Sequence, residues 1–224
     1  MTPSRRPRSL AILAALSLAA SSLAASSLAA ADASALAGHG DRVEHIVKAR
    51  RQALGTAVTV RGTVTVPSNA FDAGFAIQDG NAGIYVLDSG GAVRALGAEV
   101  EVSGTLVDSF GLLAIQPSAV VSLGNGKRVR PHKQRTGSVG EASEGRLLEL
   151  EGTMVGDLVD DSPFGFKLDI DDGSGPIQIF LFPGTGIATA GLVDGASIHV
   201  VCFSNQFDVF FECDPRRPAD LQVE

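Results

Sequence analysis

The stretch from Val58 to Asp88 constrains the fold more than any other part of the chain. Apolar residues occupy every second position in three short runs, and Gly, Asn and Asp residues separate these runs. This alternation is typical of strands with one buried and one exposed face. The stretch therefore predicts an all-β fold with tight turns.

The pattern continues to residue 124 and predicts a small barrel. We expect strands at 57–65, 75–78 and 84–87, a second hairpin of 99–106 and 112–115, and a segment at 119–123 that completes the domain. Gly62 in mid-strand predicts a bulge or a sharp bend, which a small barrel needs at its corners. Five strands would also fit an SH3-like barrel, but the longer connection between the third and fourth strands favours a five-stranded Greek-key barrel of the OB type. Residues 41–54, followed by Gly55, predict a short helix or helical turn packed on one end of this domain.

The second half of the chain repeats the first. The run 148–155 matches 58–65, and Gly152 stands where Gly62 stands. The run 171–173 matches 78–80, and 195–202 matches 97–104 with a shift of one residue. The sequence therefore predicts two tandem OB-like barrels, at residues 38–124 and 138–224, joined by a linker at 125–137.

Residues 1–37 predict an export signal. Arg5, Arg6 and Arg8 precede a short apolar run at 10–20, and small-residue cleavage sites follow. The alternative is an uncleaved membrane anchor, but Ser residues interrupt the apolar run. Arg5-Arg6 hints at the twin-arginine route, whereas Arg8 and Ser9 favour the general secretory route. We expect a periplasmic or secreted protein.

The two cysteines, Cys202 and Cys213, have no spacing typical of a zinc site. If the last hairpin turned at Phe207 and Asp208, the two cysteines would fall directly opposite each other. Cross-strand neighbours lie within disulfide reach, and an exported protein meets oxidising conditions. We therefore expect a disulfide; the alternative is a pair of reduced, partly buried thiols.

Charge is distributed unevenly along the chain. Residues 138–224 hold 4 basic and 16 acidic residues, a net charge of −12 that should repel phosphate backbones. The linker holds five basic and no acidic residues: Lys127, Arg128, Arg130, Lys133 and Arg135. These cations either dock the linker onto the acidic second barrel, which we favour, or contact nucleic acid.

Motifs for catalysis and metal binding are absent from the sequence. It contains no G-x-S-x-G, H-E-x-x-H or phosphate-cradling Gly loop, so we expect a protein that is not an enzyme and has no cofactor. The four histidines have no metal-ligand spacing, and the acidic run at 169–172 does not continue as a calcium loop. The acidic cluster at 157–161 is either a weak divalent-cation site or a solvated tip.

Several segments resemble a known family. Residues 46–50, VTVRGTVT, GFAIQDGNAGIYV and GAEVEVSGTL are similar to the bacterial extracytoplasmic OB-fold module of the nucleic-acid-binding type, which is appended to secreted nucleases and periplasmic sensor regions. Residues 139–152 and 213–223 are similar to a second such module. The resemblance implies a ligand surface on the second and third strands and two flanking loops. Carried over to this sequence, that surface comprises Arg61, Phe71, Gln78, Tyr85 and Phe110.

Two functional hypotheses follow. In the first, the first barrel binds single-stranded nucleic acid or an oligosaccharide, with Tyr85 and Phe110 as stacking platforms and Arg61, Lys127 and Arg128 as phosphate contacts. In the second, the protein is an interaction or scaffold module of the cell envelope, and the acidic second barrel engages a basic protein partner. Aromatic residues make up only 5% of the chain, which weighs against a role that depends on stacking.

Overall fold

The structure is a computed structural model, and it describes residues 42–71, 74–80 and 82–224. The predicted export signal lies outside the described residues. Nearly all regular structure is β, as the alternating pattern predicts. The short helix α2 (Ile46–Ala49) precedes the first strand and buries Ile46 and Ala49, so the predicted helix is a single turn.

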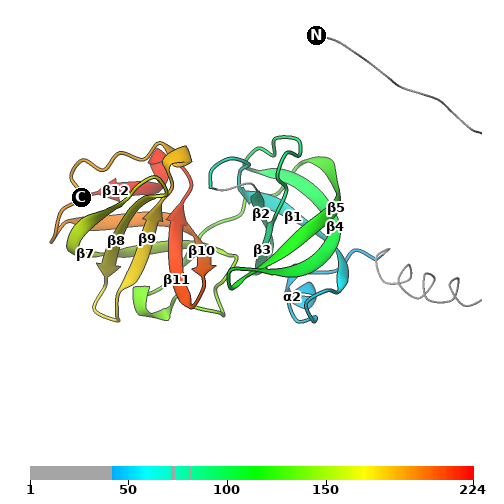
Figure 1. The fold of residues 1–224 in the computed structure, drawn as a ribbon, viewed down its shortest axis with the longest axis horizontal. Coiled ribbons are helices and arrows are strands. Elements are labelled where there is room, and N and C mark those ends of the chain that lie inside the picture. The colour runs from blue at the N-terminus through cyan, green and yellow to red at the C-terminus, as the bar shows by residue number, and fades with distance from the viewer. Residues whose placement is uncertain (1–41, 72–73, 81) are drawn as a thin grey trace, which may run out of the picture. The chain divides into compact units, whose positions relative to one another are not determined.

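The first barrel is closed by five strands in the order β1-β2-β3-β5-β4 (Figure 1). Strand β4 pairs with both β1 and β5, and β3 pairs with β5 in parallel. The strands are β1 (Ala57–Val66), β2 (Phe75–Asp79), β3 (Ala82–Val86), β4 (Ala98–Ser109) and β5 (Leu112–Asn125).

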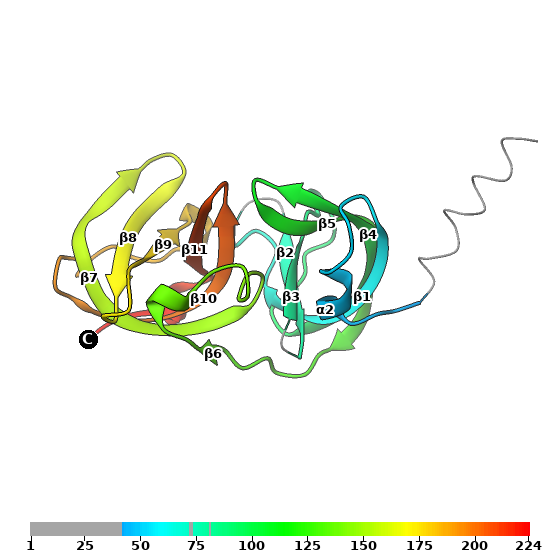
Figure 2. The same ribbon diagram turned by 90° about the horizontal axis from the view of Figure 1, so that it is seen from below.

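The second barrel repeats this topology, with β7-β8-β9-β11-β10 closed by pairing of β10 with β7 (Figure 2). Two short strands, β6 and β12, extend the sheet at its edges. The elements are β6 (His132–Lys133), η1 (Thr136–Ser138), β7 (Leu147–Asp161), β8 (Gly165–Asp171), β9 (Ile177–Leu181), η2 (Pro183–Thr185), β10 (Ser197–Phe207), β11 (Phe210–Pro215), η3 (Pro218–Asp220) and β12 (Leu221–Val223). Both barrels have the OB strand order, so the predicted fold class is confirmed.

Equivalent glycines make the same contacts in the two barrels. A Cβ on Gly62 would approach the backbone of Gln78 to 3.1–3.2 Å, and a Cβ on Gly152 would approach the backbone of Asp171 to the same distances. Each position therefore lets neighbouring strands close tightly. The bulge expected at Gly62 lies slightly later, where the register of β1 on β2 shifts between Val64 and Val66.

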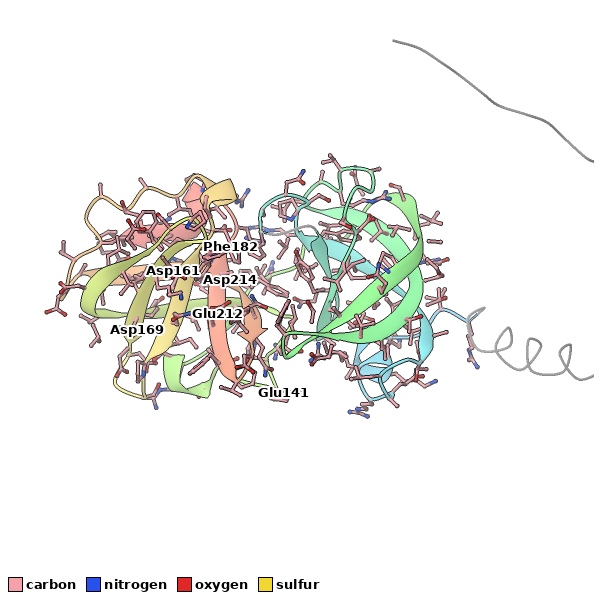
Figure 3. The ribbon with its side chains drawn as sticks, viewed as in Figure 1. Glu141, Asp161, Asp169, Phe182, Glu212 and Asp214 are labelled. Atoms are coloured by element: carbon pink, nitrogen blue, oxygen red, sulfur yellow. A yellow bond between two sulfur atoms is a disulfide. The ribbon has the colours of Figure 1, made fainter. Side chains whose placement is uncertain are left out.

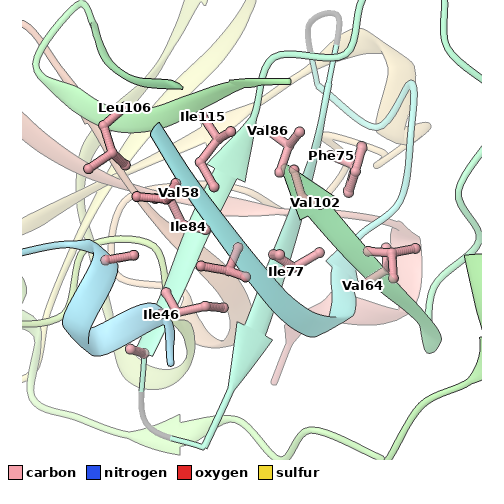
Figure 4. Packing of buried hydrophobic residues seen from close by; sticks show 14 residues of the cluster. Ile46, Val58, Val64, Phe75, Ile77, Ile84, Val86, Val102, Leu106 and Ile115 are labelled. Atoms are coloured by element: carbon pink, nitrogen blue, oxygen red, sulfur yellow. The ribbon is translucent and has the colours of Figure 1, made fainter. Parts of the chain in front are cut away.

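Each barrel encloses its own aliphatic core. In the first barrel, side chains from all five strands and from Ile46 meet inside the sheet (Figure 4). In the second barrel the core includes Met154, Leu168 and both cysteines. Phe75 is the one aromatic residue of the first core, so most aromatic side chains of the described chain lie elsewhere.

Cys202 and Cys213 form the expected disulfide inside the second barrel. The predicted register was wrong by two residues. Phe207 pairs with Phe210, so Asp208 and Val209 form the turn, and Cys213 lies opposite Ser204. The cysteines are therefore diagonal neighbours, and their Cα atoms are still only 5.3 Å apart.

Removal of this disulfide should lower the stability of the second barrel. With 11 residues of sequence separation, the chain-entropy model predicts a loss of about 3 kcal/mol in the free energy of unfolding. Urea unfolding of Cys202→Ala/Cys213→Ala measures it. Reduced wild-type protein is the matched control, because it keeps both sulfur atoms in the core. If reduction leaves the urea midpoint of unfolding unchanged, the expectation is contradicted.

The two barrels belong to one compact unit and share a third buried cluster. Phe203 of β10 packs there against Tyr85 of β3, with ring centroids 5.9 Å apart. Gly83 and Gly145 approach so closely that a Cβ on either would clash with the backbone of the other. The remaining buried members come from the first barrel: Val66, Ala70, Ala76, Leu112 and Ala114.

Buried polar groups fix this contact. The Arg50 guanidinium donates to Glu144 Oε1 at 2.8 Å and to the Gly83 carbonyl at 3.1 Å, and the same Glu144 oxygen accepts the Leu113 amide. Burial raises the pKa of Glu144, and the hydrogen bond from Arg50 acts against this rise. The two bonds to Glu144 span the barrels, so the Glu144 carboxylate satisfies donors that the first barrel buries.

A second polar contact joins the bulge in β1 to the end of the chain. Arg216 is 7% exposed, and its Nη1 donates to the Thr65 carbonyl at 2.7 Å. Two hydrogen bonds from Nε and Nη2 to the Asp220 carboxylate hold the guanidinium in place. The irregular backbone of β1 thereby gains a donor from the second barrel.

Glu144→Ala should destabilise the protein strongly, because it leaves the Arg50 charge and the Leu113 amide without their acceptor. Loss of one partner of a buried pair costs about 3–5 kcal/mol. Urea unfolding measures the change, and Glu141→Ala is the matched control because Glu141 is exposed three residues earlier. Equal, small effects of both substitutions would show that the Glu144 contacts do not hold the barrels together.

Candidate functional site

The outer face of β2 and β3, which the family resemblance implies as the ligand surface, is covered by the second barrel. Gln78 is 4% exposed, and its Oε1 accepts the Leu147 amide at 3.0 Å. Tyr85 is 6% exposed and packs on Phe203. Each side chain therefore keeps only a small exposed edge in this arrangement.

A basic groove lies on the first barrel, at the edge where β1, the β2–β3 turn and the end of β5 meet. Its volume is about 970 Å³. The polar and charged side chains that line it include three basic residues of the linker together with Arg61 of β1. The charged lining residues, together with His45 and Gln78, are Glu44, Arg61, Asp79, Glu99, Lys127, Arg128 and Arg130.

Several charges in the groove are already paired. Arg61 Nη2 lies 2.9 Å from Glu101 Oε2, and His45 Nδ1 lies 3.0 Å from Asp79 Oδ2. Lys127, Arg128 and Arg130 are exposed, and within the described part of the chain no carboxylate lies within ion-pair distance of them. The groove therefore offers three cationic side chains to an anion.

The other two cations of the linker dock onto the second barrel, as the preferred interpretation of the linker predicts. Lys133 Nζ lies 3.4 Å from both Glu149 and Glu151. Arg135 Nε lies 3.5 Å from Asp172, whose pKa is held well below its usual value, first by the Ser174 hydroxyl and also by Thr136 and Arg135. The basic linker is thus divided between two roles.

An aromatic crevice of about 390 Å³ lies where the first barrel meets the second. Six aromatic side chains line it, three from each barrel. They are accompanied by small or uncharged polar residues, among them Ser109, Asn205 and Gln206. The aromatic residues are Phe71, Tyr85, Phe110, Phe182, Phe203 and Phe207.

The structure therefore separates the predicted site residues into two groups. Arg61, Gln78, Lys127 and Arg128 line the basic groove, together with Arg130, which was not assigned to the site. The predicted aromatic residues Phe71, Tyr85 and Phe110 line the aromatic crevice instead. That all seven bind one ligand stays a prediction.

The outer face of the second barrel is acidic. Asp169, Gln178, Glu212 and Asn205 are paired in sequence across β8, β9, β11 and β10, and so share a face. Figure 3 shows Asp169 and Glu212 together with Asp161 and Asp214 over these strands. Burial raises the pKa of Glu212, while hydrogen bonds from Gln178 and Asn205 act against the rise.

One group among the described residues has metal-ligand geometry. Glu149, Glu151 and His199 bring their ligand atoms within 4.8 Å of one another on β7 and β10. Sequence reasoning missed this group because its members come from strands about fifty residues apart. His199 and Lys133 hold the pKa of Glu149 below its usual value, so the chain's own ammonium group already supplies a cation here.

Within the described residues, no helix is long and apolar enough to span a membrane. No protein-family profile and no curated protein sequence matches the chain.

Three solved structures are similar to parts of this chain. The hypothetical protein YgiW from E. coli is 19% identical, over 37% of this chain and 90% of that chain, with a TM-score of 0.32. The OB domain of MM0293 from Methanosarcina mazei is 12% identical, over 43% and 84%, with a TM-score of 0.34. A murine DNA-binding protein bound with double-stranded DNA is 13% identical, over 74% and 94%, with a TM-score of 0.38. These sequence identities and TM-scores are too low to support any conclusion about function.

The buried Glu212 should make stability depend on pH in a defined direction. Its folded-state pKa lies above the ordinary 4.5, so its contribution to stability is complete below that value and is lost as pH rises through the folded-state pKa. Glu212→Gln, which is neutral at every pH, should therefore gain stability relative to wild type between pH 4 and 7. Urea unfolding at both pH values measures this difference.

Glu151→Gln is the matched control for this experiment, because Glu151 is exposed on β7. The same pH dependence in both variants would contradict the assignment to Glu212.

Proposed function

We propose that this chain is an exported, non-enzymatic binding protein whose basic groove holds the phosphate backbone of single-stranded nucleic acid. The observation that carries the proposal is the division of the linker cations. Lys133 and Arg135 are neutralised by carboxylates of the second barrel, whereas Lys127, Arg128 and Arg130 face the groove without such partners among the described residues. Unpaired cations in a groove attract polyanions.

Binding in this groove depends on charge more than on base identity. Among the described residues that line it there is no Phe, Tyr or Trp, so phosphate contacts provide most of the affinity. The acidic second barrel, with a net charge of −12 over residues 138–224, repels the same ligand and confines it to the first barrel.

Export is supported by two features. The Cys202–Cys213 disulfide fits an oxidising compartment, and residues 1–37 have the pattern of an export signal.

A triple variant tests the groove directly. Lys127→Ala/Arg128→Ala/Arg130→Ala should weaken binding of a fluorescently labelled single-stranded oligonucleotide, measured by anisotropy over a range of salt concentrations. Each lost phosphate contact reduces the slope of log affinity against log salt by about 0.7, so the triple variant should lose about 2 in slope.

Lys133→Ala/Arg135→Ala is the matched control, because these linker cations are docked on the second barrel and should leave the slope unchanged. Equal losses in both variants, or no binding by wild type at low salt, would sink the proposal. A sulfated polysaccharide serves as competitor: if it binds and the oligonucleotide does not, the ligand is an anionic oligosaccharide.

A second candidate function is engagement of a basic protein partner by the second barrel. The acidic outer face over β8, β9 and β11 favours it. Pull-down from periplasmic extract, with and without nuclease, separates the two: a protein partner survives nuclease treatment, and a nucleic-acid tether does not.

A further inference from the structure

The aromatic crevice holds half of the aromatic residues of the chain. The sequence contains 11 Phe, one Tyr and no Trp, and six of these twelve line one depression of about 390 Å³. The two barrel cores are built almost entirely from aliphatic side chains. A volume of this size is ordinary for a small-molecule site.

The rings of the crevice contact one another across the two barrels. Phe71 lies 4.9 Å from Phe182 and 6.1 Å from Phe203 between ring centroids. Phe110 stacks on Phe207 at 5.7 Å, and the Asp208 amide donates to the Phe110 carbonyl at 2.5 Å. The walls are thus held by contacts between equivalent hairpin tips.

The backbone of Phe110 is strained where its ring borders the crevice. Its φ is +54°, in the left-handed region that bulky residues rarely adopt, and its side chain is 73% exposed. Glycine would fit this turn without strain. Strained residues of this kind gather at ligand sites.

The electrostatic surroundings of the crevice are negative. Among the described residues, no charged side chain lines it. Some described residues are next in sequence to a lining residue, or are paired with one across the sheet. All of these neighbours that can ionise are acidic: Asp88, Asp108, Asp208, Glu212 and Asp214. Gln206 Oε1, a carbonyl oxygen of a lining residue, is buried without a hydrogen-bond donor. A ligand in the crevice meets aromatic rings with negatively charged surroundings.

The second barrel already holds one of its own cations between an aromatic ring and a carboxylate. Lys167 Nζ lies 5.6 Å from the centre of the Phe180 ring and 2.6 Å from Asp161. Phe180 in turn packs on Phe182, which lines the crevice, with centroids 4.6 Å apart.

We propose that the aromatic crevice binds a small organic cation with apolar substituents, of the quaternary or substituted ammonium class. The aromatic rings that line the crevice attract the positive charge, and the apolar substituents displace water from it. This site is separate from the basic groove and does not depend on binding of nucleic acid.

Intrinsic fluorescence reads out the crevice directly, because Tyr85 is the one Tyr of a chain without Trp. Choline is the probe, and its neutral isostere, with carbon in place of the quaternary nitrogen, is the control ligand. Choline should change Tyr85 emission saturably at millimolar concentrations. The isostere should bind about tenfold more weakly, the effect of losing a desolvated cation–π contact.

Phe110→Gly removes one ring and suits the backbone of the turn, so the variant should fold and bind choline about tenfold more weakly. Phe207→Ala should act in the same direction. Phe164→Ala is the matched control, since Phe164 is 68% exposed outside the crevice, and should bind as wild type does. No saturable response of wild type, equal affinity for choline and isostere, or an equal loss in Phe164→Ala would overturn the proposal.

Discussion

The contact between the β2–β3 face of the first barrel and the second barrel determines which surfaces of the first barrel stay exposed. It combines the Phe203–Tyr85 ring contact, the close approach of Gly83 and Gly145, and the Arg50–Glu144 and Gln78–Leu147 hydrogen bonds. Aliphatic packing alone would allow the barrels to slide, whereas directional bonds to buried groups specify one arrangement. The surface on which an isolated barrel of this kind could hold a ligand is thereby used to join the two halves of the duplication.

Both proposed binding sites therefore lie at the margins of that contact. At one margin, the basic groove keeps the linker cations that the acidic barrel does not neutralise. At the other, rings from both barrels enclose the aromatic crevice among acidic neighbours. The two depressions have opposite electrostatic character, so they suit ligands of opposite charge. The duplication thus yields two chemically distinct surfaces from two copies of one fold.

The sequence predicts the strands and the duplication well, because alternation and the paired glycines Gly62 and Gly152 are local signals. It predicts the disulfide but misplaces the hairpin turn by one residue, which shifts the pairing register by two, since Phe207 and Asp208 resemble the turn at Phe110 and Gly111. Alternation also shows that Gln78 and Tyr85 point outward, yet an outward side chain can face solvent or another barrel. The Arg50–Glu144 pair, 94 residues apart, has no sequence signal at all. The contact between the barrels, which the sequence does not reveal, divides the predicted site residues between the basic groove and the aromatic crevice.

Amide hydrogen exchange tests the joining of the barrels most directly. The Leu147 amide donates to Gln78 Oε1 and the Leu113 amide donates to Glu144 Oε1, so each is protected by a side chain from across the contact. If the barrels form one unit, both amides should exchange as slowly as amides paired within the β-ladders of either barrel. Fast exchange of Leu113 and Leu147, beside slow exchange in the ladders, would show that the barrels move independently and would contradict the account.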